Sequence, residues 1–301
     1  MKKIAIIGAG NVGAHVASVA VNKGLPVELI IIDRNQEFEM GHVLDLRDSL
    51  LFSPNARVRS GDLTDKFTRE ADVFVITAGA AQEPGETRID LLGRNVEILK
   101  SIKKDLGTLK KEAIVILVSN PVDIITQIAT EIFGLSKGQV FGTGTLLDTS
   151  RLRWRLAERF DRNISNIHGY VLGEHGDSEF VAWSTVDHAE EIPEKERIEL
   201  EKQVRRAAYE IIEGKGATYF GIGAATVDIM SSIILDSGRV FPVSAPLHGE
   251  YGIKRIAIGV PVKIGAKGIE EVIEKHLLPE ELEKLQGSAK KLKDILSDLQ
   301  Q

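Results

Sequence analysis

The apolar positions at the start of the chain change from the spacing of a strand to that of a helix. Residues 3–7 form a short β-branched run that ends at a glycine, and residues 12–21 carry small and apolar side chains at helical spacing. A continuous apolar run bounded by glycine is typical of a buried strand. The pattern therefore predicts a strand, a tight turn and a helix.

The same alternation continues through the first half of the chain. Further apolar runs of buried-strand type, separated by segments with helical spacing, lie at residues 27–32, 56–59, 73–76, 114–118 and 140–141. Strands that alternate with helices form a mainly parallel sheet with helices on both faces. The predicted fold class is α/β, with a doubly wound parallel sheet over residues 1–141.

The pattern changes in the second half, which is expected to be an α+β domain over residues 142–301. Long helical stretches and strand-like pieces are expected at 146–160, 194–214, 218–235, 240–244, 254–263 and 280–300. No Ser/Gly-rich linker separates the halves, so the two domains are expected to pack along a shared cleft.

Composition agrees with two folded domains and narrows the classes of partner. The chain has 301 residues, of which 43% are hydrophobic and 27% charged, more than a single core usually holds. Its net charge of −6 disfavours nucleic acid as a partner. Because it has no cysteine, disulfides, thiolate metal sites and thiol catalysis are excluded, and no metal site is expected.

The N-terminus has one feature of a secretory signal. Lys2 and Lys3 precede a mostly apolar stretch, but Asn11, His15 and several glycines interrupt it. No other segment has the apolar length needed to span a bilayer. We expect a cytoplasmic protein without a membrane partner.

Glycines between the first strand and the first helix point to a dinucleotide. Gly8, Gly10 and Gly13 lie in the sequence GAGNVG, where they permit a tight turn and bring backbone N–H groups to a pyrophosphate. Asp33, at the end of the second strand, is placed to accept the ribose hydroxyls of adenosine and to repel a 2′-phosphate; Arg34 weakens that preference. The glycine sequence alone also fits a merely tight turn, but in this context it predicts a Rossmann NAD-binding domain.

Five motifs in order carry a resemblance to a known family. They are GAGNVG at 8–13, TAGAAQEPGETR at 77–88, SNPVD at 119–123, DTSRLR at 148–153 and GEHGDS at 173–178. Over essentially its whole length the chain resembles the lactate and malate dehydrogenase superfamily, and most of all its L-lactate dehydrogenases. The resemblance implies an NAD-dependent 2-hydroxy acid dehydrogenase. The residues expected to contact NAD are Gly8, Gly10, Asn11, Val12, Gly13, Asp33, Thr77, Ala78, Gly79, Asn95, Val118 and Asn120.

Hydride transfer from a 2-hydroxy acid requires a group that takes the hydroxyl proton. Histidine suits that task near neutral pH, and a partnered carboxylate orients its ring. His175 matches the catalytic histidine of the family, and Asp148 matches the carboxylate that pairs with it. A structural histidine is the alternative, which the motif disfavours.

The resemblance assigns further residues to the substrate. Arg151 matches the guanidinium that binds the substrate carboxylate, whereas Arg153, two positions along the same helix, must point elsewhere. Arg88 matches the residue that polarises the carbonyl, at the end of a loop expected to close over the substrate. Asn120 matches the residue that hydrogen-bonds the substrate oxygen, and Thr218 matches the pocket threonine of lactate-type members.

Gln82 stands at the position that, in the family, contacts the C3 substituent of the substrate. Malate enzymes typically have arginine there, because a second carboxylate needs a cation, and lactate enzymes have glutamine. Gln82 and the adjacent Glu83 therefore favour lactate. The short stretch between residues 178 and 194 and the chain length of 301 residues are instead similar to compact archaeal malate enzymes. A malate dehydrogenase and a dual-specificity enzyme stay open as alternatives.

Arg153 and His168 match positions that bind fructose 1,6-bisphosphate across a subunit interface in allosteric members. The resemblance thus implies a homotetramer with a fructose 1,6-bisphosphate effector, while ordinary contacts of both side chains are the alternative.

Two other classes of protein share the first motif. A non-catalytic NAD-binding relative would not need the set of Arg88, Asp148, Arg151 and His175. An NAD-dependent glycosidase would be expected to have metal-ligating cysteine or histidine downstream, and the lack of cysteine disfavours it.

Overall fold

The computed structural model describes residues 1–80 and 88–299, with the backbone alone for Arg88 and Ile89. The strands of its first half are β1 (Lys2–Ile7), β2 (Val27–Ile32), β3 (Arg57–Ser60), β4 (Val73–Ile76), β5 (Ile114–Leu117) and β6 (Val140–Gly142). The helices between them are α1 (Asn11–Asn22), α2 (Gln36–Asp48), α3 (Lys66–Arg69), α4 (Arg88–Leu106) and α5 (Val122–Phe133). The strand–helix alternation therefore matches the sequence pattern.

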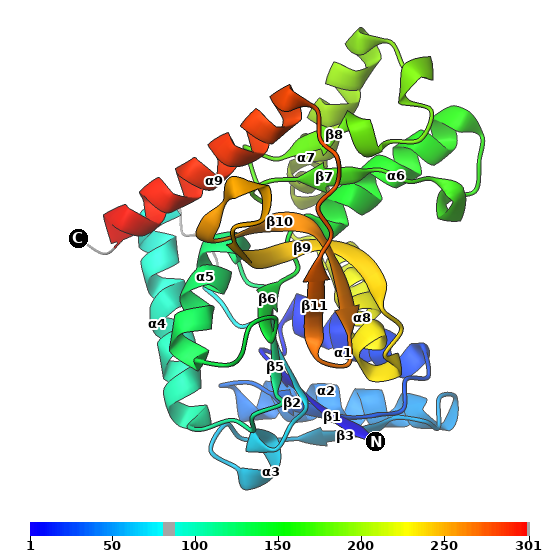
Figure 1. The fold of residues 1–301 in the computed structure, drawn as a ribbon. Helices are drawn as coiled ribbons and strands as arrows, with labels where there is room; N and C mark the ends of the chain where they lie inside the picture. Colours follow the sequence, from blue (N-terminus) through cyan, green and yellow to red (C-terminus); the bar gives the residue numbers. More distant parts are fainter. Residues whose placement is uncertain (81–87, 300–301) are drawn as a thin grey trace.

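These strands form the parallel part of a nine-stranded sheet with the order β3-β2-β1-β4-β5-β6. Every residue of β4 and β5 is buried, because helices cover both faces of the sheet. Figure 1 shows α1 and α2 on one side and α4 and α5 on the other. The predicted doubly wound parallel sheet is confirmed.

The second half contains more helix and extends the same sheet. Its helices are α6 (Leu146–Phe160), α7 (Glu194–Lys215), α8 (Phe220–Leu235) and α9 (Pro279–Leu299). Its strands are β7 (Tyr170–Leu172), β8 (Phe180–Ala182), β9 (Arg239–His248), β10 (Lys254–Gly265) and β11 (Gly268–Val272). Single turns of 3₁₀ helix lie at Ser49–Leu51 (η1), Ile164–Asn166 (η2), Trp183–Thr185 (η3), Ala189–Glu191 (η4) and Glu250–Gly252 (η5).

The two halves are joined by backbone pairing. β9 lies next to β6, antiparallel to it, with Gly142 opposite Ser244, and β10 and β11 continue the sheet beyond β9. The boundary expected after residue 141 therefore falls inside a strand of a shared sheet. β7 and β8 form a separate two-stranded sheet.

Several element bounds differ from the sequence pattern. The helix expected from residue 218 begins at Phe220, because Gly216 ends α7 in a left-handed conformation and Tyr219 is not yet helical. β7, β8 and β11 were not predicted, since three to five residues are too few to show a period. Among the described residues, no helix combines the length and apolar character needed to cross a membrane.

Gly144, just after β6, is where the junction of the two halves tolerates no side chain. Its φ is +51°, and a Cβ there would lie 2.2 Å from the Ser244 nitrogen in β9. Gly134, at the end of α5, has a similar φ of +60°, but no atom of the described residues beyond its chain neighbours lies within 4 Å of its Cβ position. A comparison of alanine substitutions at the two glycines therefore separates the effect of backbone strain from that of steric contact.

We expect Gly144→Ala to lower the free energy of unfolding by at least about 3 kcal/mol, because left-handed strain and overpacking add. Gly134→Ala should lower it by about 1–2 kcal/mol, from strain alone. Urea unfolding followed by circular dichroism measures both. Equal losses for the two variants would contradict the close contact with β9.

Candidate active site

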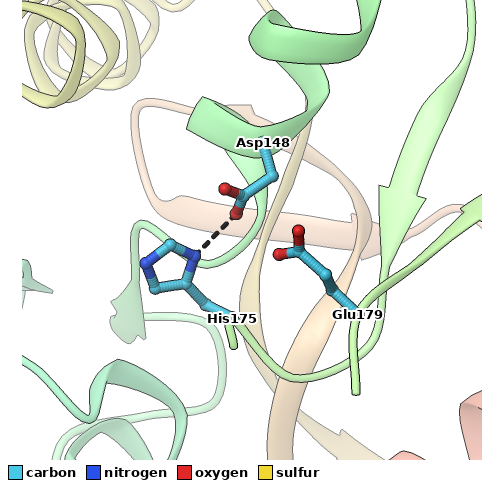
Figure 2. Close-up of side chains that lie close together, drawn as sticks. All are labelled: Asp148, His175 and Glu179. Atoms are coloured by element: carbon cyan, nitrogen blue, oxygen red, sulfur yellow. Dashed lines mark hydrogen bonds and ion pairs between the residues drawn. The ribbon is translucent and has the colours of Figure 1, made fainter. Parts of the chain in front are cut away.

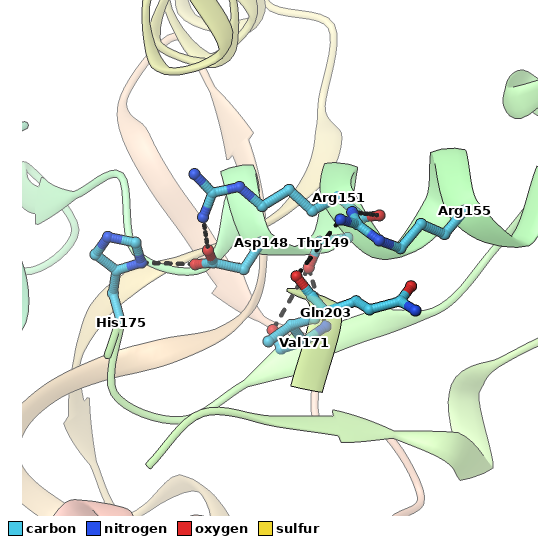
Figure 3. A network of polar contacts seen from close by, with 7 residues as sticks. All are labelled: Asp148, Thr149, Arg151, Arg155, Val171, His175 and Gln203. Carbon is cyan, nitrogen blue, oxygen red and sulfur yellow. Dashed lines mark hydrogen bonds and ion pairs between the residues drawn. The ribbon is translucent and has the colours of Figure 1, made fainter. Parts of the chain in front are cut away.

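Asp148 brings two cationic side chains together at the start of α6. Its Oδ2 lies 2.6 Å from Nδ1 of His175, which is in the loop after β7, and Arg151 donates to its Oδ1 at 2.7 Å (Figures 2 and 3). Asp148 and Arg151 can meet because residues three apart lie on the same face of a helix. The structure thus brings together Asp148 and His175, the two residues that the resemblance pairs.

Burial and charge set the ionisation of this group. Asp148 is 1% exposed and His175 25% exposed by side chain. Burial works against ionisation of Asp148, but the charges and hydrogen bonds of His175 and Arg151 hold its pKa below the usual value. The negative charge of Asp148 raises the pKa of His175 to about 9, although burial opposes the charged imidazolium. The histidine is therefore protonated near neutral pH.

Two buried acids beside His175 were missed in the sequence. Asp123, in the first turn of α5, accepts the backbone N–H of His175 at 2.7 Å, and burial raises its pKa to about 6. Glu179 points toward Asp148 and His175 in Figure 2, and burial, with repulsion from Asp148, raises its pKa to about 9. Asp123 lies within SNPVD and Glu179 directly follows GEHGDS, but nothing in the sequence distinguishes these acids from solvated ones.

The spacing of the acids and the histidine would also admit a metal ion. One ligand atom each from Asp148, His175 and Glu179 lies within 4.8 Å of the others. However, the Nδ1 atom of His175 already bonds Asp148, and the Arg151 cation lies 2.7 Å from that carboxylate. A divalent cation would be repelled by this guanidinium, so the cluster is better suited to proton transfer.

The glycine loop after β1 has the shape of an anion cradle. Gly8 has a φ of +103°, and a Cβ on Gly13 would lie 1.8 Å from the Gly8 oxygen, so the turn is tight at both positions. At Gly10, by contrast, no described atom beyond its chain neighbours lies within 4 Å of the Cβ position, and no described side chain caps the N-terminus of α1. Open N–H groups at a helix N-terminus suit a pyrophosphate. Asp33 fixes the loop by accepting the Ala9 N–H at 2.7 Å.

The other residues expected at the cofactor follow β4 and β5, beside this loop. Ala78 lies against Gly8: a Cβ atom added to this glycine would lie 2.7 Å from the backbone nitrogen of Ala78. Asn95, in α4, accepts the Ala80 N–H at 2.7 Å and donates to the Asn120 carbonyl at 2.8 Å. The carboxyl ends of β1, β4 and β5 thus bring the predicted residues to one edge of the sheet, where dinucleotides bind in such folds.

Comparisons with known proteins identify the family. Residues 2–142 match the family model described as lactate/malate dehydrogenase, NAD binding domain, and residues 145–301 match the alpha/beta C-terminal domain of the same family. The chain belongs to the lactate/malate dehydrogenase family. The predicted family, the NAD cofactor and the class of NAD-dependent 2-hydroxy acid dehydrogenase are confirmed.

Relatives of this dehydrogenase cover its whole length. It is 40% identical to L-lactate dehydrogenase 1 of Clostridium acetobutylicum, over 99% of this chain and 98% of that protein. The solved minor L-lactate dehydrogenase of Enterococcus mundtii superposes with a TM-score of 0.94 at 38% identity, covering 99% and 98% of the two chains. A lactate dehydrogenase from a Medee basin deep-sea metagenome library has the same TM-score of 0.94 at 36% identity, covering 100% and 99%.

Some of the remaining predicted residues of the dehydrogenase lie outside the described part. Gln82 and the Arg88 side chain fall among the residues that the structure does not describe. Thr218 is half-buried in the loop before α8. Arg153 points away from Arg151, as expected, because its Nε donates to the Gly169 carbonyl at 3.1 Å, next to the exposed His168.

We expect the pKa of His175 to fall from about 9 toward its ordinary value of 6.5, or below, in Asp148→Asn, because the charge that raises it is removed. NMR titration of the imidazole measures this. Asp161→Asn, which removes an exposed acid at the other end of α6, is the control and should leave the pKa unchanged.

The same pair predicts how stability depends on pH. A histidine whose folded-state pKa is raised stabilises the fold fully below pH 6.5 and loses that contribution as pH rises through about 9. The difference in unfolding free energy between the wild type and Asp148→Asn should therefore narrow between these values; a constant difference would contradict the ion pair.

Proposed function

We propose that the chain is an L-lactate dehydrogenase that reversibly reduces pyruvate with NADH, with His175 as the proton donor and acceptor. The observation that carries this proposal is the buried Asp148 carboxylate, which binds His175 with one oxygen and Arg151 with the other. Such a carboxylate fixes a proton donor and a carboxylate-binding guanidinium relative to each other. The relatives named L-lactate dehydrogenase support the same activity.

Reduction of a 2-oxo acid needs a hydride, which NADH supplies when bound, and a proton. Because Nδ1 of His175 faces Asp148, Nε2 is the atom that donates the proton to the substrate oxygen. The neutral imidazole that remains keeps its Nδ1–H bond to Asp148. In oxidation the same Nε2 takes the proton back.

Arg151 is proposed to bind the substrate carboxylate. One of its N–H groups is committed to Asp148, and the planar guanidinium offers others for a paired hydrogen bond with a carboxylate. Arg88 is proposed to polarise the carbonyl, Asn120 to hydrogen-bond the substrate oxygen, and Thr218 to line the pocket. These roles rest on the resemblance to the family.

The NAD contacts are likewise proposed residue by residue. The glycine loop and the first turn of α1 hold the pyrophosphate. Asp33 accepts hydrogen bonds from the hydroxyl groups of the adenosine ribose. The nicotinamide end is bordered by residues 77–79, Asn95, Val118 and Asn120. Among the described residues, the open Cβ position of Gly10 and the lack of a side-chain cap on α1 support this fit.

Pyruvate is proposed over oxaloacetate because the neutral amide of Gln82 does not compensate a second carboxylate. The expected kcat/KM with NADH is roughly 100-fold higher for pyruvate than for oxaloacetate. Steady-state rates over a wide range of both substrates measure it. A preference for oxaloacetate would place the chain among the malate dehydrogenases, and similar values would indicate a dual-specificity enzyme.

We expect His175→Asn to lower kcat by about 1,000-fold, because the proton donor is lost, while the Kd for NADH stays nearly unchanged. Stopped-flow turnover and nicotinamide fluorescence measure the two quantities. Retained turnover would favour a proton donor elsewhere, and loss of NADH binding would count against the assigned role. Turnover in the wild type also rejects the non-catalytic alternative.

A homotetramer is proposed for the assembled enzyme. Large apolar side chains are exposed along α2, at Phe38 and Leu44, and at the chain that follows it, where Leu51 is 83% and Phe52 85% exposed. Apolar patches of this kind are typical of subunit interfaces. Activation by fructose 1,6-bisphosphate at Arg153 and His168, and a cytoplasmic location, stay predictions; addition of the bisphosphate to the pyruvate assay tests the first.

A further inference from the structure

Glu39 is a buried acid that the catalytic chemistry does not use. It lies in α2, which packs against β2 and β3, and is 4% exposed. One of its carboxylate oxygens accepts the backbone N–H of Asp33 at 2.8 Å. Burial raises its pKa, and repulsion from Asp33 adds to this, while hydrogen bonds from Asp33, Ser60 and Gly61 act in the opposite direction.

Glu39 therefore binds the backbone of Asp33, the acid that is expected at the adenosine ribose. Asp33 itself is held by two backbone donors, Ala9 to Oδ2 at 2.7 Å and Asn35 to Oδ1 at 3.0 Å. Within the described ranges, no cation lies within ion-pair distance of Glu39. A buried carboxylate without a counter-ion projects its field over several ångströms, because little water screens it.

We propose that Glu39 is a second determinant of cofactor choice, which adds its charge to that of Asp33 and repels the 2′-phosphate of NADP. The proposal rests on the proposed role of Asp33 at the ribose. The proposal also explains why Arg34 need not make the site prefer NADP. Arg34 is exposed beside Asp33 and by itself would attract a phosphate, but the charges of two neighbouring carboxylates exceed its single charge. At an effective dielectric constant of about 20, the repulsion between two unit charges less than about 10 Å apart corresponds to at least a ten-fold effect on binding.

The test compares Glu39→Gln with Glu37→Gln. Both substitutions remove one negative charge from the first turn of α2, but Glu37 is exposed and Glu39 is buried against Asp33. Nicotinamide fluorescence gives the Kd of each full-length variant for NADH and for NADPH at pH 7.5. We expect Glu39→Gln to lower the ratio of the Kd for NADPH to the Kd for NADH about ten-fold. Glu37→Gln should change this ratio less than two-fold.

Two further variants keep the outcome decisive. Glu39→Leu removes the charge without leaving a buried amide, so it is measured in parallel, with thermal unfolding to establish that each variant is folded. A ratio that stays constant in both folded Glu39 variants, or that changes equally in Glu37→Gln, overturns the proposal. Asp33→Asn is the separate test of the ribose assignment: if it leaves the ratio unchanged, that assignment fails, whatever Glu39 does.

Discussion

The buried charge of Asp148 is the constraint on which the rest of the site depends. A carboxylate taken out of water is costly unless both oxygens find charged or hydrogen-bonding partners, and here His175 and Arg151 supply them. The contact between Asp148 and His175 requires α6 and the loop after β7 to keep a fixed position relative to each other. The Thr149 hydroxyl accepts the Val171 N–H at 3.0 Å, which ties α6 to β7 (Figure 3).

The shared sheet brings this constraint next to the cofactor loops. α6 begins a few residues after β6, and β6 is both the last parallel strand and the partner of β9. The loop that carries His175 is fixed at Gly173, whose backbone pairs with Gly259 of β10, and at His175 itself by Asp123 of α5. Segments from both halves of the chain thus hold one histidine at the carboxyl edge of the parallel strands.

How much of this could be predicted depended on whether a signal is local. Strand–helix alternation predicted the parallel sheet, because each period is visible within ten residues, whereas β7 and β8 were too short to show one. Motifs located His175, Asp148 and Arg151. The buried acids Glu39, Asp123 and Glu179 were missed, because burial is decided by elements far away in the chain and a glutamate in an amphipathic helix resembles a solvated one.

The charged groups differ between the proposed substrate site and the proposed adenosine site. At the proposed substrate site, Asp148 is the ionised acid in direct contact with two cations, and the raised pKa of Glu179, about 9, keeps that neighbour protonated near neutral pH. In the proposed reaction one substrate carboxylate pairs with the Arg151 guanidinium, and a second carboxylate would need a further cation. At the proposed adenosine site the Glu39 carboxylate accepts the backbone N–H of Asp33, and two neighbouring acids would favour hydroxyl groups over phosphate there. If both proposals hold, a single fold attracts an anionic group at the Asp148 group, which forms at the start of α6, and excludes another anionic group at Asp33, which follows β2.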